Sequence, residues 1–141
     1  MELNEIFQKV KNHLLNQNAK SGTLREDFKL DKFGANPPFN PISCMYKDPN
    51  GNKCAVGCLF VDDENTKYVW CENKSISDSN VQDELIRAGV LTQEDCHLGF
   101  HHGKFHLLHE LQQIHDWEKV EDWPECLNNL AKSFGINTNG T

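Results

Sequence analysis

The cysteines of this 141-residue chain and one of its seven histidines have the types and spacing that thiol chemistry would use. Three of the six cysteines, Cys44, Cys54 and Cys58, flank one short turn, and His115 and Asp116 follow much later. A thiol becomes a nucleophile when a nearby imidazole helps it to lose its proton. One interpretation is therefore a thiol-dependent hydrolase or transferase, with Cys54 as nucleophile and His115 as base.

Two features weigh against catalysis. The dipole of a helix start lowers the pKa of a thiol, whereas we expect Cys54 on a strand. Asp116 follows His115 directly, so the two side chains diverge by about 100° on a helix and we expect no orienting pair between them. The sequence thus favours a protein that is not an enzyme, without deciding the question.

The same side chains could also bind metal. Cys54 and Cys58 have a C-x3-C spacing, but four residues of a strand span about 13 Å, too far for two thiolates on one zinc. His102, His106 and His109 form a row at i, i+4 and i+7. The row lacks the glutamate of an H-E-x-x-H site, so a solvent-facing row is favoured and a metal site is the weaker alternative. We expect no cofactor.

His115 is unusual because it falls on the apolar side of its predicted helix, about 20° from Leu108. A buried imidazole needs partners for its nitrogens, because an unsatisfied group costs about 1–3 kcal/mol. Two alternatives stay open: a core histidine satisfied by a backbone carbonyl, or a base or ligand at the bottom of a pocket.

Helical periodicity recurs along the chain. The apolar residues of 2–17 lie on one stripe, which predicts a helix. Further helices are predicted from a capping pattern at 79–82, from Thr92 as an N-cap, over 101–117, and from Pro124 to a stop at Gly135. Residues 18–42 predict a loop region rich in proline and asparagine, with a turn near 24–30, and 136–141 a frayed tail.

Strands are predicted around the cysteine cluster. Asn50-Gly51 lies between apolar-containing runs, which favours a hairpin, and Gly57 indicates a bulge or a close backbone approach. The run 67–71 resembles a third strand. We therefore predict a single α+β domain over 1–141, with a small antiparallel sheet (a hairpin plus the third strand) packed against three or four helices.

Charge narrows the possible partners. The net charge is −7, and residues 61–141 hold 15 acidic and only 6 basic residues. Nucleic-acid binding is disfavoured because lysines and arginines must neutralise phosphates. No apolar run is long enough for a membrane span, and no basic-then-apolar leader is visible, so a soluble cytoplasmic protein with reduced thiols is expected.

Three quoted segments, "SCMYKDPNGNKCAVGCLFVDDE", "LLHELQQIHDW" and "LAKSFGI", resemble a family of small proteins encoded mainly by tailed bacteriophages and prophages. The shared pattern is a Cys-x-Tyr arm, a glycine turn, "KCAVGCL" and a later "LQ-x-x-HD". This sequence departs from it at Glu72-Asn73, where members carry an acidic-glycine pair. The resemblance implies an accessory protein in bacterial cytoplasm and suggests that the two motifs meet.

Three functions are compatible with these patterns. The favoured one is a non-enzymatic accessory or counter-defence protein that binds a host protein through its acidic C-terminal half. The second is a small-ligand or nucleotide-binding module with a pocket between the KCAVG segment and the His115 helix, and the third is the thiol enzyme. The oligomeric state is not predicted. The residues expected to bind a ligand are Tyr46, Lys53, Cys54, Gly57, Gln112, His115, Asp116 and Trp117.

Overall fold

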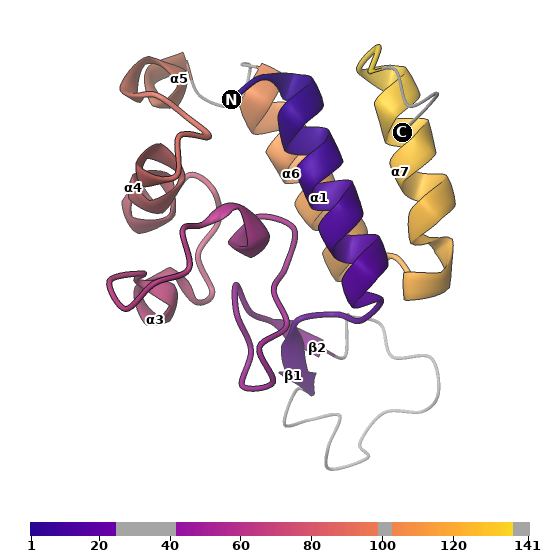
Figure 1. The fold of residues 1–141 in the computed structure, drawn as a ribbon, viewed down its shortest axis with the longest axis horizontal. Helices are drawn as coiled ribbons and strands as arrows, with labels where there is room; N and C mark the ends of the chain where they lie inside the picture. The colour runs from indigo at the N-terminus through magenta and orange to yellow at the C-terminus, as the bar shows by residue number, and fades with distance from the viewer. Residues whose placement is uncertain (25–41, 99–102, 137–141) are drawn as a thin grey trace.

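Three helices lie side by side and form the main layer of the molecule (Figure 1). They are α1 (Leu3–Gln17), α6 (Gly103–Trp117) and α7 (Trp123–Ser133). The computed structural model describes residues 1–24, 42–98 and 103–136. The buried side chains form one hydrophobic cluster that draws on all three helices.

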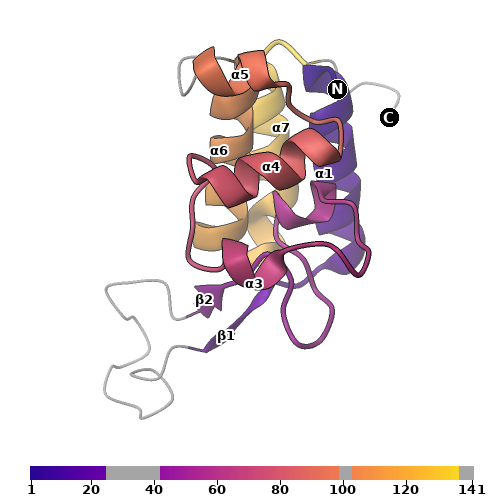
Figure 2. The same cartoon turned by 90° about the vertical axis from the view of Figure 1, so that its left-hand side faces the viewer.

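Three shorter helices flank this layer on one side (Figures 1 and 2). They are α3 (Tyr68–Cys71), α4 (Ser79–Arg87) and α5 (Gln93–Leu98). Two 3-10 turns, η1 (Gly57–Leu59) and η3 (Val120–Asp122), complete the helical elements of the described residues. A short strand pair, β1 (Gly22–Leu24) and β2 (Ile42–Cys44), lies at one end of the layer (Figure 1).

The helices predicted from periodicity and capping are confirmed. α1 buries its apolar stripe, Ile6, Phe7, Val10 and Leu14, because these positions recur on one face. In α4 the N-cap is Asp78, one residue before the predicted capping pattern, and its carboxylate accepts a hydrogen bond from the Asn80 N–H.

The later helices also begin where local signals place them. Thr92 accepts a hydrogen bond from the Asp95 N–H, and Asp95 accepts one from the Thr92 N–H, which is the reciprocal arrangement of a capping box. Pro124 lies in the first turn of α7, where its missing N–H costs no hydrogen bond. Gly135, after α7, has the positive φ of a helix stop (68°).

The predicted α+β fold is wrong. The described residues contain β1 and β2 as their regular strands, paired antiparallel with Gly22 opposite Cys44. Of the expected hairpin, which began at Cys44, only that residue belongs to either strand. Residues 22–24 were expected in a loop, as was Ile42. The molecule is a helical protein with a minor strand pair, because the apolar segments at 54–60 and 67–71 fold back on the helices instead of pairing with each other.

The turn at 48–52 forms, but its flanking strands do not. Asp48 accepts hydrogen bonds from the N–H groups of Asn50, Asn52 and Gly22, and an isolated bridge joins Lys47 to Lys53. Beyond Lys53 the chain turns helically, and the Cys58 N–H donates to the Cys54 carbonyl at 3.0 Å. The local hairpin signal therefore holds from Lys47 to Lys53, and no regular strands extend from it.

The predicted third strand is the short helix α3. The N–H groups of Trp70 and Cys71 both donate to the Lys67 carbonyl. Tyr, Val and Trp favour strands only when a partner strand covers them, and here Val69 and Trp70 are exposed while Cys71 is buried.

Two loop predictions fall partly outside the described residues. The turn expected near 24–30 and most of the expected tail, residues 137–141, are not described. Ile136, which was expected to open that frayed tail, is instead buried, and its N–H donates to the Ala131 carbonyl at 2.8 Å.

Candidate functional site

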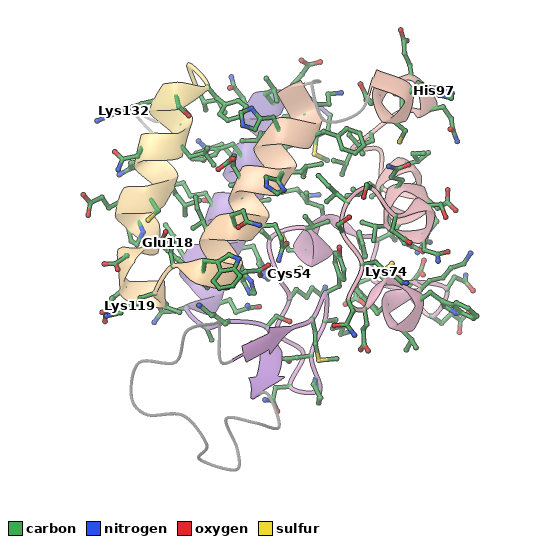
Figure 3. All side chains as sticks on the ribbon, turned by 180° about the vertical axis from the view of Figure 1, so that it is seen from behind. Cys54, Lys74, His97, Glu118, Lys119 and Lys132 are labelled. Carbon is green, nitrogen blue, oxygen red and sulfur yellow. The ribbon has the colours of Figure 1, made fainter. Side chains whose placement is uncertain are left out.

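A cavity of about 370 Å³ opens between α6 and two segments that precede α4. Its α6 wall is formed by His109, Gln112, Gln113 and Asp116. The facing wall is formed by Met45, Tyr46, Cys54 and the run from Asn73 to Ile76. In Figure 3, Cys54 is labelled beside α6, and Lys74 lies on the side that carries α3 and α4.

Helical spacing places the four α6 side chains on this wall. His109, Gln112, Gln113 and Asp116 stand at i, i+3, i+4 and i+7, which puts them on one face of a helix. The core face of the same helix carries Leu107, Leu108, Leu111 and Ile114. The helix is therefore anchored by one face and presents polar side chains to the cavity with another.

Tyr46 joins the two segments of the opposite wall. Its hydroxyl donates to the Lys74 carbonyl at 2.6 Å, and its ring stacks on Phe60 with centroids 5.5 Å apart. Gly57 lies so close to this residue that a Cβ atom would stand 2.1 Å from the Tyr46 carbonyl oxygen. The close backbone approach predicted at Gly57 is thus confirmed, and it fixes the 54–60 turn against the wall.

A continuous set of hydrogen bonds runs behind the cavity. The Ser21 N–H donates to His115 Nε2 at 3.0 Å, and His115 Nδ1 lies 2.7 Å from Asp116 Oδ1. The same carboxylate oxygen accepts a bond from Gln112 Nε2 at 2.7 Å, and Gln112 Oε1 accepts one from the Val56 N–H at 3.1 Å. The network ties the segment after α1 and the 54–60 turn to α6.

The prediction that His115 and Asp116 cannot pair is wrong. Neighbouring side chains diverge at their Cβ atoms, but the Asp116 carboxylate reaches back to the imidazole. His115 is fully buried, as predicted, and its ring stacks on that of Trp123 with the ring centroids 5.7 Å apart. Its partners are a backbone N–H and a carboxylate, not the backbone carbonyl that the core interpretation assumed.

This geometry leaves His115 poorly suited to act as a base. A backbone N–H can only donate, so Nε2 is the accepting nitrogen of the imidazole. Nδ1 therefore carries the proton and donates a hydrogen bond to the Asp116 carboxylate. The lone pair that a general base would need is already engaged with Ser21. A core histidine that orders its neighbours describes the arrangement better than a catalytic one.

Cys54 is equally unsuited to be a nucleophile. Its side chain is buried, and its sulfur accepts a hydrogen bond from the Gly57 N–H at 3.2 Å. Burial raises the pKa of the Cys54 thiol far above its ordinary value, and the hydrogen bond from Gly57 offsets only part of this effect. Burial likewise raises the pKa of Cys58 to about 12. Both thiols are protonated at neutral pH.

The metal predictions can be compared with the same geometry. The distance argument against zinc at Cys54 and Cys58 rested on a strand that does not form. Within the part of the chain that is described, no group of three or more His, Cys, Asp or Glu side chains is placed to hold a metal ion. In the histidine row, Nε2 of His106 lies 3.5 Å from Oε1 of Glu110. His109 lines the cavity, and His102 lies outside the described residues.

Half of the predicted ligand-binding residues line the cavity. Tyr46, Cys54, Gln112 and Asp116 do so. His115 lies behind the wall, and Gly57 packs against Tyr46. The Lys53 ammonium pairs with Asp62 at 2.9 Å, and Trp117 is 57% exposed at the end of α6. None of these last four is among the lining residues.

Sequence reasoning missed the rest of the wall. Gln113 could have been found, because it stands four residues after His109 on the predicted helix. Met45 and the run from Asn73 to Ile76 carry no such signal, because they lie in irregular segments. Ser21, whose hydroxyl lies 2.6 Å from the Met45 carbonyl oxygen, was also not predicted to contact the site.

Comparisons with protein-family models, curated proteins and solved structures find no match for this chain. The resemblance to a bacteriophage and prophage family therefore stays a prediction. Among the described residues, no helix is both long enough and apolar enough to cross a membrane.

Proposed function

We propose that this chain is a non-enzymatic binding protein whose cavity between α6 and residues 45–76 takes a small molecule. The observation that carries the proposal is the cavity itself, a hollow of about 370 Å³ with apolar and polar groups on facing walls. Ligand sites in proteins are commonly concave, apolar for the most part, and about 300–1,000 Å³ in volume.

The absence of catalysis is part of the same proposal. A nucleophile and its base must be within hydrogen-bond reach of each other. Here the sulfur of Cys54 accepts from Gly57 and the accepting nitrogen of His115 is engaged with Ser21. These contacts weigh against thiol chemistry.

A pair of serine variants tests the cavity. Ser75 lines it, whereas the neighbouring Ser77 does not, and both side chains are exposed. We expect Ser75→Trp to abolish the binding of fragment-sized compounds detected by ligand-observed NMR, because the indole blocks the cavity. Ser77→Trp is the matched control and should keep the same binders. Equal binding by both variants, or no binder to the unmodified chain, would contradict the proposal.

A second candidate function, binding to a host protein, is favoured by a different feature. Val69 and Trp70 on α3 are 79% and 68% exposed. Residues 60–84 around them hold seven acidic and two basic residues. An exposed tryptophan in acidic surroundings suits a partner with an apolar pocket edged by lysine or arginine. The bacteriophage origin, the counter-defence role and the bacterial cytoplasm remain proposals.

A photo-crosslinking residue at position 69 tests this second function in host lysate. A basic host protein should be crosslinked, and Trp70→Ser should remove that product. Trp117→Ser is the control, since Trp117 is also exposed but lies at the end of α6. Crosslinking that is insensitive to Trp70→Ser would count against the surface on α3.

A further inference from the structure

We propose that the ligand of this cavity is an uncharged planar heterocycle with an amide-like edge, of the size of a nucleobase or nucleoside. The inference rests on the proposed small-molecule function and adds the chemical class. An amide-like edge is a hydrogen-bond donor beside an acceptor, as in a lactam. Three properties of the cavity lead to this class: its carboxamides, its apolar surface and its charge.

Two carboxamides at the cavity have no hydrogen-bonding partner within the described part of the chain. They belong to Gln113 on α6 and Asn73 on the facing segment. Gln113 is half-buried. By contrast, the Gln112 amide is engaged at both ends, with Val56 and Asp116. A carboxamide offers a donor and an acceptor side by side, which matches the edge of a lactam.

Most of the surface that lines the cavity is apolar, which suits a flat ring. Met45, Cys54 and Ile76 contribute sulfur and aliphatic surface. The Tyr46 hydroxyl already donates its proton to the Lys74 carbonyl, so this residue has no free hydroxyl proton to offer a ligand. Aromatic and sulfur-containing side chains pack favourably against planar rings.

Charge separates a neutral heterocycle from a phosphorylated one. Asp116 places a carboxylate in the wall, and the chain as a whole has a net charge of −7. Lys74 is the one lysine or arginine among the lining residues, and it is exposed. A phosphate would meet like charge without the cluster of cationic donors that usually holds it. A nucleobase or nucleoside is therefore favoured over a nucleotide.

Matched probes test the class by isothermal titration. Uridine and inosine carry the lactam edge, their 5′-monophosphates add the phosphate, and indole is flat but lacks the edge. At least one nucleoside should bind, and its monophosphate and indole should each bind about tenfold more weakly, the equivalent of about 1.4 kcal/mol.

Variants of the two carboxamides complete the test. Gln113→Leu should weaken nucleoside binding about tenfold. Asn73→Gly should also weaken it, and glycine keeps the left-handed backbone that Asn73 adopts (φ 62°). Gln93→Leu on α5 is the control, because Gln93 is exposed and does not line the cavity. Melting curves establish that each variant is folded.

The outcomes distinguish this inference from the proposed function. If indole binds as tightly as the nucleosides, or if Gln113→Leu has no effect, the ligand class is wrong while the cavity remains a binding site. If monophosphates bind more tightly than nucleosides, the charge argument is wrong. If neither these probes nor the fragment-sized compounds bind, both proposals fall.

Discussion

His115 connects parts of the chain that are far apart in the sequence. Its imidazole binds the Ser21 N–H and the Asp116 carboxylate and stacks on Trp123. Through Asp116 it also orders Gln112, whose carboxamide accepts a bond from the backbone of the 54–60 turn. A buried polar residue with both nitrogens satisfied specifies one arrangement of its neighbours, because each lost partner leaves an unsatisfied group.

We expect His115→Ala to lower the free energy of unfolding by about 3 kcal/mol, since it removes a buried ring and leaves the Ser21 N–H without its acceptor. Urea denaturation measures the change. His97→Ala is the control, because His97 is exposed near the end of α5 (Figure 3), and its effect should stay within about 0.5 kcal/mol. Equal stability of the two variants would contradict the structural role of His115.

At the scale of elements, the segment 45–60 is held in place by contacts made to its backbone, not by pairing in a sheet. The Gln17 side chain binds both backbone polar groups of Lys53. Its amide N–H donates to the Lys53 carbonyl at 2.9 Å, and its oxygen accepts from the Lys53 N–H at 2.8 Å. Gly57 then passes against the Tyr46 carbonyl. α1 thus takes the place that a neighbouring strand would have in the predicted hairpin.

The tight passage at Gly57 predicts a large effect of one methyl group. Gly57→Ala should destabilise the fold by about 2–3 kcal/mol, because the new Cβ would collide with backbone atoms that cannot move aside easily. Thermal unfolding followed by circular dichroism measures it. Gly103→Ala is the matched control, since the nearest atom to its Cβ would be Leu3 Cδ1 at an ordinary 3.8 Å. A similar loss in both variants would show that the Tyr46 contact is unimportant.

At the scale of the whole molecule, the layer of α1, α6 and α7 carries the core, and the site depends on it. Trp123 is fully buried, its indole N–H donates to the Ile114 carbonyl, and its ring covers His115. The His115–Asp116 hydrogen bond therefore links the cavity wall on α6 to the packing between α6 and α7. Loss of this packing should disrupt the site as well.

Trp123 can report on this coupling. The other tryptophans, Trp70 and Trp117, are exposed, so the double variant Trp70→Phe/Trp117→Phe leaves one buried fluorophore. We expect its fluorescence and the far-ultraviolet circular dichroism to change at the same urea concentration, as in a single cooperative transition. Separate midpoints for the two signals would contradict a shared unit.

The sequence by itself determined most of the helices and four of the eleven residues that line the cavity. Apolar residues at helical spacing, the Thr92 cap and Pro124 predicted α1, α5, α6 and α7, because a few neighbouring residues decide periodicity and capping. Tyr46, Cys54, Gln112 and Asp116 were expected at a pocket, and all four line the cavity.

Only the tertiary structure decided that the expected sheet does not form and which other residues line the cavity. The segments at 54–60 and 67–71 have strand-like composition, but β propensity depends on a covering partner, and the helices cover the first while the second stays partly exposed. The contacts of Ser21 with His115 and of Tyr46 with Lys74 join residues 94 and 28 positions apart. Such contacts depend on how distant segments pack together, which no local pattern in the chain encodes.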